Sequence, residues 1–394
     1  MFELRTIRIG ELGRVITGKT PPSSRPELFG DFHPFLTPTD IDGFARYIEP
    51  ARFLSPEGRI YQHRLMLPER AVCVVCIGAT IGKVCMTARP SFTNQQINSV
   101  IVNEKEHDPF FVYHLMTTLR DELKTNAGGA ATPIINKTAF SEIEVSVPPL
   151  RVQRRIGSIL SGYDELIENS QRRIRLLETM ARALYREWFV RENLAEQKPN
   201  LNFQNQKFGE LCNLVKDPFC LELHNDRPLL DLSRMPQHSL APGETGPASE
   251  LTTSRILFQA GDTLFGAIRC YLHKVVAAHY LGVTNTSVLV LRPAKPYLRS
   301  LVALIASDRE TIRWADTHST GTKMPVINWG VFQTMPTPVP SVALAERFEA
   351  AAGPMLDQIG VLATQIQNLR RTRDLLLPRL LSGQVELGAG KAIS

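Results

Sequence analysis

A five-residue segment in the first half of the chain recurs in similar form in the second half, and this recurrence constrains the fold more than any other feature. Residues 132–136 read TPIIN, and residues 324–328 read MPVIN, 192 positions further on. The segment GEL at 10–12 likewise returns at 209–211. A chain of 394 residues has room for two domains of ordinary size. We therefore expect a duplicated module of about 190 residues rather than an array of short repeats.

Each half begins with short apolar runs, such as AVCVVCIGA and SVLVLRP, separated by Gly, Pro and Asn residues. Runs of this kind are typical of strands and turns. Helical patterns lie between them, and each half then crosses a Pro-marked boundary into a long helical pattern. The sequence therefore predicts an α+β fold in which each of two mixed domains leads into a long helix.

The two long helical patterns share one heptad register. Steps of four and three from Ile156 to Trp188 meet apolar residues at nine of ten positions, and so do the positions 192 residues later. Such a 3.5-residue stripe predicts helices that pair with each other, here in antiparallel fashion. Two helices that pack separately on their own domains remain the alternative. The residues expected to form the helix pair are Ile156, Leu160, Ile167, Ile174, Leu177, Leu184, Phe348, Ile359, Ile366, Leu369 and Leu376.

An antiparallel pair implies a geometry for the whole chain. The first helix spans about 48 Å from Ile156 to Trp188 at about 1.5 Å per residue. We expect the two mixed domains at opposite ends of this coiled-coil spacer, related by an approximate two-fold axis. Such domains would meet one DNA duplex one or more turns apart, since a turn is about 34–36 Å. The sequence thus predicts a reader of two DNA sites with an unread gap.

Composition narrows the class of protein only a little. The formal charge of +6 fits a polyanionic partner, although a merely basic soluble protein fits it equally well. Cys73 and Cys76 have the spacing of a metal or redox pair, but a buried strand of small apolar residues explains them better. The N-terminus has no uninterrupted apolar stretch typical of a signal peptide, and no run reaches the length of a membrane helix. We expect a cytoplasmic protein.

Four segments resemble the specificity (S, HsdS) subunits of type I restriction-modification enzymes. PPLRVQRRIGSIL at 148–160 resembles the start of their central conserved helix. GELGRVITGKTP at 10–21, and Gly78-Ala79-Thr80-Ile81-Gly82 with Lys83, resemble parts of their target recognition domains. LLLPRLLSGQVEL at 375–387 is similar to the end of their distal helix. The second half departs from the pattern, because the segment from Val339 to Glu346 lacks the Pro-Pro pair and the Gln.

The resemblance implies a domain order and a set of partners. Each recognition domain would bind one half of a bipartite site in double-stranded DNA, and the helices would dock two methyltransferase subunits. Restriction and motor subunits would join the complex. The chain itself would be non-catalytic and hold no cofactor, with S-adenosylmethionine on the methyltransferase subunits. The implied parts are recognition domain 1 (1–149), central helix (150–194), linker (195–207), recognition domain 2 (208–340), distal helix (341–383) and a flexible tail (384–394).

Two motifs favour enzymes that act alone, and each has a counter-argument. The segment from Gly13 to Thr20 matches the phosphate-binding P-loop pattern, but Pro21-Pro22 follows where a helix would have to begin. Asp108-Pro109-Phe110-Phe111 is similar to a methyltransferase signature without its second proline. A P-loop NTPase, a nucleic-acid methyltransferase and a coiled-coil scaffold that binds only protein remain the alternatives.

Base-reading side chains should come from the residue types that match base edges. Arg and Lys pair with guanine, and Asn and Gln pair with adenine. Each candidate also has an ordinary role, as a solvated charge or a turn residue. The candidates are Lys19, Arg46, Lys83, Asn94, Gln95 and Gln96 in the first domain, and Arg269, Lys274, Asn285 and Lys323 in the second.

Overall fold

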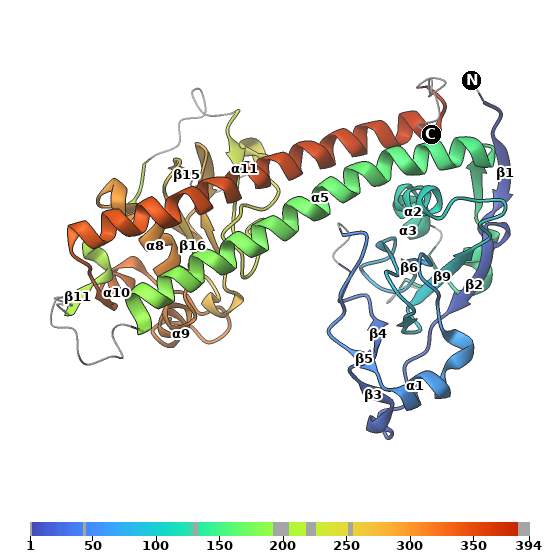
Figure 1. The fold of residues 1–394 in the computed structure, drawn as a ribbon, viewed down its shortest axis with the longest axis horizontal. Helices are drawn as coiled ribbons and strands as arrows, with labels where there is room; N and C mark the ends of the chain where they lie inside the picture. The colour runs from blue at the N-terminus through green and yellow to red at the C-terminus, as the bar shows by residue number, and fades with distance from the viewer. Residues whose placement is uncertain are drawn as a thin grey trace. The chain divides into compact units, whose positions relative to one another are not determined.

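The protein divides into two compact units, which we describe separately (Figure 1). Unit 1 comprises residues 1–168 and 369–394, and unit 2 comprises residues 169–368. Each unit therefore holds one of the sequence repeats and a part of each long helix. The computed structural model describes residues 2–41, 45–125, 127–128, 133–191, 205–217, 226–250 and 255–384.

Unit 1 is built on two small sheets and one two-stranded ribbon. The main sheet is antiparallel throughout, in the order β2 (Gly13–Thr17), β9 (Ile97–Val102), β6 (Val72–Val75) and β7 (Val84–Met86). The second sheet has the order β3 (Phe29–Gly30), β5 (Phe53–Leu54), β4 (His33–Leu36) and β8 (Phe92–Thr93). The ribbon pairs β1 (Arg5–Arg8) with β10 (Glu144–Val147). The helices among these strands are α1 (Pro56–Tyr61), α2 (Pro109–Thr118), α3 (Arg120–Thr125) and α4 (Lys137–Glu142).

Unit 2 repeats the main sheet and the ribbon of unit 1, while its second sheet has a different strand order. Its main sheet has the order β12 (Cys212–Val215), β19 (Val288–Pro293), β16 (Thr263–Gly266) and β17 (Val275–Ala277). Its second sheet has the order β14 (Gly246–Pro247), β13 (Pro228–Leu229), β18 (Gly282–Asn285) and β15 (Arg255–Phe258). The ribbon pairs β11 (Asn205–Lys207) with β20 (Pro336–Pro338). The helices are α8 (Arg299–Ala306), α9 (Arg309–Thr317) and α10 (Trp329–Phe332).

The recurring Ile-Asn pair has one structural role in both units. Asn136 caps α4 by accepting a hydrogen bond from the backbone of Ala139, and Asn328 caps α10 in the same way. The preceding residues Ile135 and Ile327 are buried in the cores. In both units the Asn therefore caps a short helix and the Ile anchors the chain in the core, just before the last strand of the domain.

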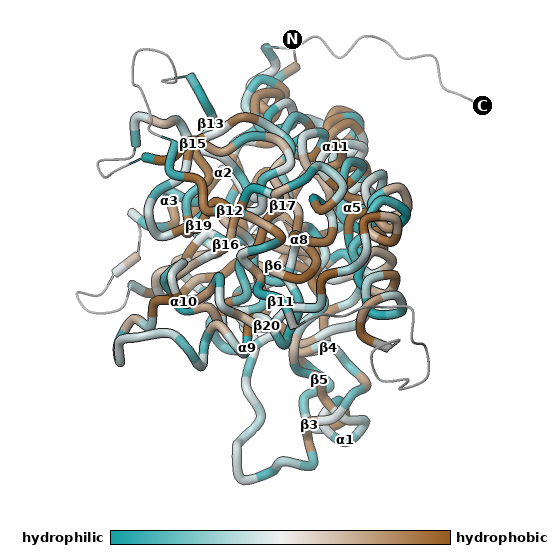
Figure 2. Tube along the Cα trace, turned by 90° about the vertical axis from the view of Figure 1, so that its left-hand side faces the viewer, coloured by the Kyte–Doolittle hydropathy of each residue, from teal (hydrophilic) through white to brown (hydrophobic). Residues whose placement is uncertain are grey.

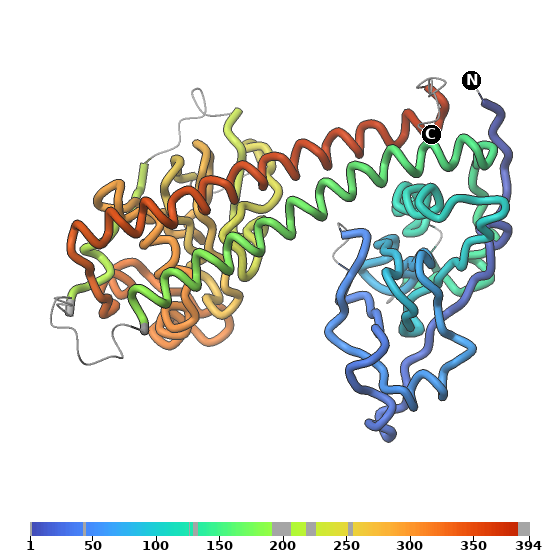
Figure 3. Tube along the Cα trace, viewed as in Figure 1, coloured from blue at the N-terminus to red at the C-terminus, as the bar shows by residue number. Residues whose placement is uncertain are grey.

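The two long helices, α5 (Leu150–Tyr185) and α11 (Val342–Leu381), lie beside each other in each unit (Figure 3). In unit 1 the Arg373 guanidinium of α11 lies 2.7 Å from the Asp164 carboxylate of α5. In unit 2 Phe348 of α11 packs edge-on against Phe189, with ring centroids 4.9 Å apart. Early residues of α5 thus meet late residues of α11, and the reverse holds in unit 2, so the helices run antiparallel. The expected α+β fold with a long helical pair is confirmed.

The buried stripe of α5 follows a helix period rather than a strict heptad. From Gln153 to Phe189 the most buried positions advance 36 residues in ten steps, or 3.6 per step. Late in the helix Glu178 and Tyr185 are buried, each one position beyond the expected Leu177 and Leu184, which are half-buried. The reason is that each helix packs on a domain core as well as on its partner. Hydrophobic and hydrophilic residues alternate along both helices (Figure 2).

Most residues expected at the helix pair face inward. The buried ones are Ile156, Leu160, Ile167, Ile174, Phe348, Ile359 and Ile366. Leu177, Leu184, Leu369 and Leu376 are half-buried. In unit 1 the helix residues share one core with the main sheet and with α2, and in unit 2 they share one with α8. Each helix therefore contacts both its partner helix and a domain core. Pairing of the helices and packing on the domains each describe part of the arrangement.

The structure corrects one expected boundary. The domain order implied by the sequence places residues 205–207 in the linker, but they form β11, in which Gln206 pairs with Thr337 of β20. The second domain therefore begins no later than Asn205, as β1 begins the first. The central helix continues beyond α5 as a π-helical turn, Arg186–Arg191, and residues 192–204 lie outside the described residues. So does the tail after Gln384.

Candidate nucleic-acid interface

One end of each main sheet collects loops that carry polar side chains. Because neighbouring strands are antiparallel, the end where β2 and β6 finish is also where β7 and β9 begin. In unit 2 the ends of β12 and β16 meet the starts of β17 and β19 in the same way. We call this end, where two strands finish and two begin, the loop end of the sheet. Nine of the ten candidate readers lie on or beside the loop ends, and Arg46 is the exception.

Residues 18–20 and 94–96 form the loop end of unit 1. The backbone of Lys19 donates a hydrogen bond to the Thr93 carbonyl, and the hydroxyl of Thr20 donates to Oε1 of Gln95 over 2.8 Å. Lys19 and Gln95 are exposed. Asn94 is 7% exposed, and its amide donates to Oε1 of Gln96 over 2.9 Å. Asn94 therefore shapes the loop, while Lys19 and Gln95 face solvent.

Arg269, Asn285 and Lys323 lie at the loop end of unit 2. Arg269 and Lys323 are exposed, and Asn285 is half-buried with its side-chain oxygen accepting from the backbone of Ser287. Lys323 belongs to a hairpin closed by two backbone hydrogen bonds between Thr320 and Val326. This surface presents a guanidinium, an ammonium and an amide on loops with fixed backbone.

The backbone hydrogen bonds at the two loop ends correspond one by one. In each unit the residue directly after the strand donates to the loop before the last strand of the sheet, the turn residue donates to a proline carbonyl, and the buried isoleucine donates to the residue directly after the strand. The unit 1 bonds are Cys76 to Gln96, Gly78 to Pro133 and Ile135 to Cys76, and the unit 2 bonds are Ala267 to Ser287, Arg269 to Pro325 and Ile327 to Ala267. The loop end is thus the same construction made twice with different side chains.

Three of the candidate cations are engaged within the protein. Nζ of Lys83 donates to the Ile41 carbonyl over 2.7 Å, and Nζ of Lys274 donates to the Leu232 carbonyl over the same distance. Both lysines tie a loop to the start of the strand that follows them. Burial lowers the pKa of Lys274, which fits an ammonium partly removed from water. Arg46 is 4% exposed and bonds to Glu168 of α5 through two nitrogens, each 3.2 Å from an oxygen.

Similarity to proteins of known class matches this geometry. Residues 2–179 match the model of the type I restriction modification DNA specificity domain. The chain is related to the specificity subunits of type I restriction enzymes. The HindI specificity subunit of Haemophilus influenzae is 35% identical over 178 residues, which make up 43% of this chain and 38% of that relative. The MjaIX specificity subunit of Methanocaldococcus jannaschii is 23% identical, over 96% of this chain and 93% of that one.

A solved structure supports the fold over nearly the whole chain. The type I restriction-modification system S subunit from M. genitalium covers 96% of both chains with a TM-score of 0.60 and 16% sequence identity. At this identity the likeness concerns the fold. The fold of this chain, including its two repeats, is therefore similar to the fold of a solved S subunit.

The two enzyme-like motifs serve structural roles in this relative of the specificity subunits. Residues Gly13–Thr17 of the P-loop pattern form β2, and no α-helix starts at Lys19. Asp108 caps α2 by accepting from the backbone of Phe111 over 2.9 Å. Cys73 and Cys76 are buried on and directly after β6, as expected, and burial raises the pKa of the Cys76 thiol to about 11. The described residues contain no group of three or more side chains placed to hold a metal ion.

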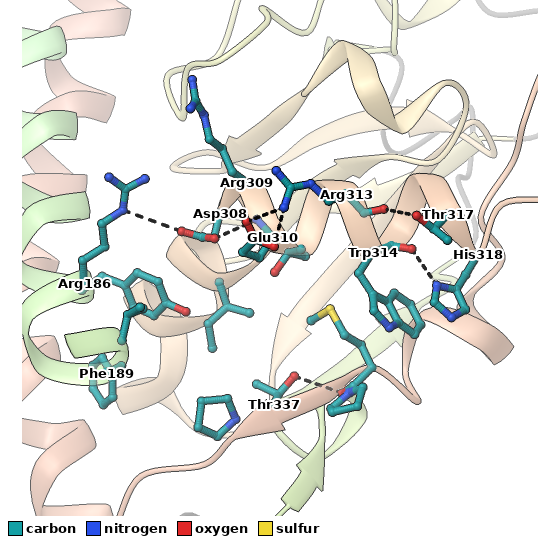
Figure 4. Close-up of a pocket in the computed structure, with 17 residues that line it drawn as sticks. Arg186, Phe189, Asp308, Arg309, Glu310, Arg313, Trp314, Thr317, His318 and Thr337 are labelled. Carbon is teal, nitrogen blue, oxygen red and sulfur yellow. Dashed lines mark hydrogen bonds and ion pairs between the residues drawn. The ribbon is translucent and has the colours of Figure 1, made fainter. Parts of the chain in front are cut away.

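A groove of about 820 Å³ in unit 2 lies between the end of α5 and α9 (Figure 4). Three of its ionisable side chains make short-range contacts: Asp308 caps α9, and Arg313 pairs with Glu310 over 2.9 Å. The His318 ring stacks on Trp314 at 4.0 Å between centroids, and its Nδ1 lies 2.8 Å from the Trp314 carbonyl. These contacts cap and tie a helix, and they do not pair a nucleophile with a base.

No helix in the described part of the chain is both long and apolar enough to span a membrane.

Two features of unit 2 do not follow from the residue pattern considered above. Tyr271 is 53% exposed beside Arg269, and an aromatic at this position, where the first repeat has Thr80, was a readable signal. Arg269 and His273 have left-handed backbones, with φ of 53° and 52°. Residue identity alone does not announce such a backbone, but comparison with Gly78 and Gly82 of the first repeat would have suggested it.

Proposed function

We propose that this chain is the non-catalytic, DNA sequence-reading subunit of a type I restriction-modification complex. Each loop end would read one half of a bipartite site in double-stranded DNA. The observation that carries the proposal is the duplicated loop end, built on the same backbone hydrogen bonds in both units but with different side chains. A duplicated frame with different side chains is what two unlike half-sites require. The relationship to specificity subunits supports it.

The exposed side chains at the loop ends divide by chemistry. Lys19 and Lys323 would contact phosphates, because a flexible ammonium suits a point charge. Gln95, Asn285 and Arg269 have the planar groups that match base edges in the major groove. Asn94 and Gln96 would hold the loop that presents Gln95. Lys83, Lys274 and Arg46 would act through the fold, because each is already engaged.

The partners follow from the same proposal. Two methyltransferase subunits, which carry S-adenosylmethionine, would dock on the helix pair, and restriction subunits would complete the assembly. Exposed apolar residues on the outer faces of the helices, such as Leu166, Leu176 and Val361, offer contact area for such subunits.

Exchange of one domain tests the proposal. The chain is co-purified with the methyltransferase subunits of its source genome, and methylated sites are mapped on a randomised DNA library. We expect a split motif with an unread gap. Replacement of residues 1–149 by the equivalent part of another specificity subunit should change one half of the motif and leave the other half and the gap unaltered.

Two outcomes would contradict the proposal. A change in both halves would mean that the domains do not read separately. Binding of the complex that shows neither a sequence preference nor a dependence on salt would favour a protein-binding scaffold, because neutralised phosphates make DNA affinity fall steeply with salt.

A further inference from the structure

Arg269 occupies a backbone position that favours glycine. The equivalent residue of unit 1 is Gly78, which has φ of 85° and donates the equivalent hydrogen bond to a proline carbonyl. A non-glycine residue in the left-handed region is strained, because its Cβ approaches the following carbonyl oxygen. An arginine that persists there is a strained residue at an exposed loop, and strain of this kind gathers at functional sites.

The second left-handed residue of this loop, His273, has a structural explanation. It corresponds to Gly82 of unit 1, which has φ of 82°. The His273 ring is buried, lies 4.7 Å from the His238 ring, and has Nε2 2.9 Å from the Ser307 carbonyl. Packing therefore accounts for His273.

Packing does not account for Arg269. Within the described part of unit 2 its guanidinium has no hydrogen-bond or ion-pair partner, and the side chain is exposed. The arginines elsewhere in the unit that carry charge-pair contacts include Arg234, Arg292 and Arg299. A guanidinium that has no partner in the described part of unit 2 is available to bind a group outside the protein.

The turn that carries Arg269 is held firmly. Its carbonyl accepts from the backbone of Leu272, and its backbone N–H donates to Pro325 of the neighbouring hairpin. Cys270 is 2% exposed and its thiol lies 3.8 Å from the hydroxyl of Ser319, which anchors the turn from beneath. A rigid support reduces the entropy lost when the guanidinium binds.

We propose that Arg269 reads a guanine in the half-site of unit 2, with its guanidinium donating to O6 and N7 of the base in the major groove. Gly78 has no side chain at the equivalent point, so unit 1 lacks this reader and its half-site is read by other residues. One backbone position thereby makes the two half-sites different. This inference rests on the proposed function, in which each loop end reads one half-site.

The test is Arg269→Gly, which installs the residue that unit 1 uses. Glycine suits the left-handed backbone, so the variant should fold at least as stably as the parent. Methylated or bound motifs are compared on a randomised library with the same methyltransferase subunits. We expect the preference for guanine at one position of the second half-site to fall about 5- to 150-fold, with the first half and the gap unchanged.

Two control variants isolate the reading role. Lys323→Ala removes one charge from the adjacent hairpin, and we expect weaker binding to all sequences, a salt slope lower by about one, and the same motif. His273→Gly removes the other left-handed side chain and should also leave the motif unchanged.

Three outcomes are decisive. A parent complex without any split motif would overturn the proposed function and this inference with it. A split motif that Arg269→Gly leaves intact would overturn the inference alone. A uniform loss of affinity with a lower salt slope, as for Lys323→Ala, would make Arg269 a phosphate contact and also overturn it.

Discussion

Lys83 and Lys274 are equivalent residues with equivalent bonds, each donating from Nζ to a backbone carbonyl over 2.7 Å. We expect Lys83→Met and Lys274→Met to lower the free energy of unfolding by about 1–3 kcal/mol, because each leaves a carbonyl without its charged donor. Urea denaturation measures the change. Lys19→Met, at an exposed lysine, should change it by less than about 0.5 kcal/mol.

The Lys83 and Lys274 variants also separate a structural role from a role in recognition. If the two bonded lysines act through the fold, the DNA motif of the Lys83 and Lys274 variants should match that of the parent. A motif altered by either substitution would return that lysine to the reading surface.

Asp164 lies at the centre of a buried charge cluster in unit 1. His114 Nε2 lies 3.1 Å from one oxygen, and Arg373 lies 2.7 Å from the other. Burial raises the pKa of Asp164, but the adjacent His114 ring and the charge of Arg373 outweigh burial and hold the pKa below its ordinary value. The carboxylate therefore stabilises the fold wherever it is ionised.

We expect Asp164→Asn to destabilise unit 1 by about 3–5 kcal/mol at pH 7, since Arg373 would remain largely buried with only the exposed Asp374 as an ion-pair partner. A lowered carboxyl pKa stabilises the folded state above the unfolded pKa, and this stability is lost as the pH falls. The deficit of the variant should therefore shrink below about pH 4. Unfolding curves at several pH values measure it, with Glu165→Gln at an exposed neighbour as the control. A deficit independent of pH would show that the charge is not the cause.

Single residues show where sequence reasoning stops. Residue type selected candidates that lie at the loop ends, but it did not separate Lys19 from Lys83, because a carbonyl acceptor such as that of Ile41 is visible only once the chain folds. Arg46 was expected to face DNA for its charge alone, whereas the structure buries it against Glu168, 122 residues away.

At the scale of elements, the core between α5 and α11 gives the next prediction. Phe348 is fully buried between Phe189 and Trp188, with ring centroids at 4.9 and 5.7 Å. We expect Phe348→Ala to lower the free energy of unfolding by about 3–5 kcal/mol, because it removes a buried ring and leaves a cavity. Thermal or urea unfolding measures this. Val361→Ala on the exposed face of the same helix is the control, and equal losses would contradict the one-sided packing.

The positions of the long helices along the chain were easier to predict than which of their residues are buried. Pro-marked boundaries located the start of α5 and α11, and apolar spacing located the helices themselves. The heptad did not identify Glu178 as buried, because a charged residue is counted as outward. Its carboxylate accepts from the Ser239 hydroxyl over 2.6 Å and from the Leu240 backbone over 2.7 Å. A contact to the domain, which no helical pattern contains, decides its place.

At the scale of the whole molecule, the proposed function assigns the helix pair the role of a spacer. The register set by Asp164 with Arg373, and by Phe189 with Phe348, places residues 167–173 opposite residues 364–370. Deleting both segments shortens each helix by about 10 Å and turns its face by only about 20°. That length matches about three base pairs of duplex at about 3.4 Å each.

We expect the double deletion to change the unread gap or to abolish assembly with the methyltransferase subunits, because the two loop ends would meet the duplex at a different spacing and on a different side. Deleting only one segment should disrupt the pairing and serves as the mismatched control. Motif mapping with the same subunits measures the gap. An assembled complex that carries the double deletion and keeps the parental gap would mean that the helices hold the domains together without determining how far apart their half-sites lie.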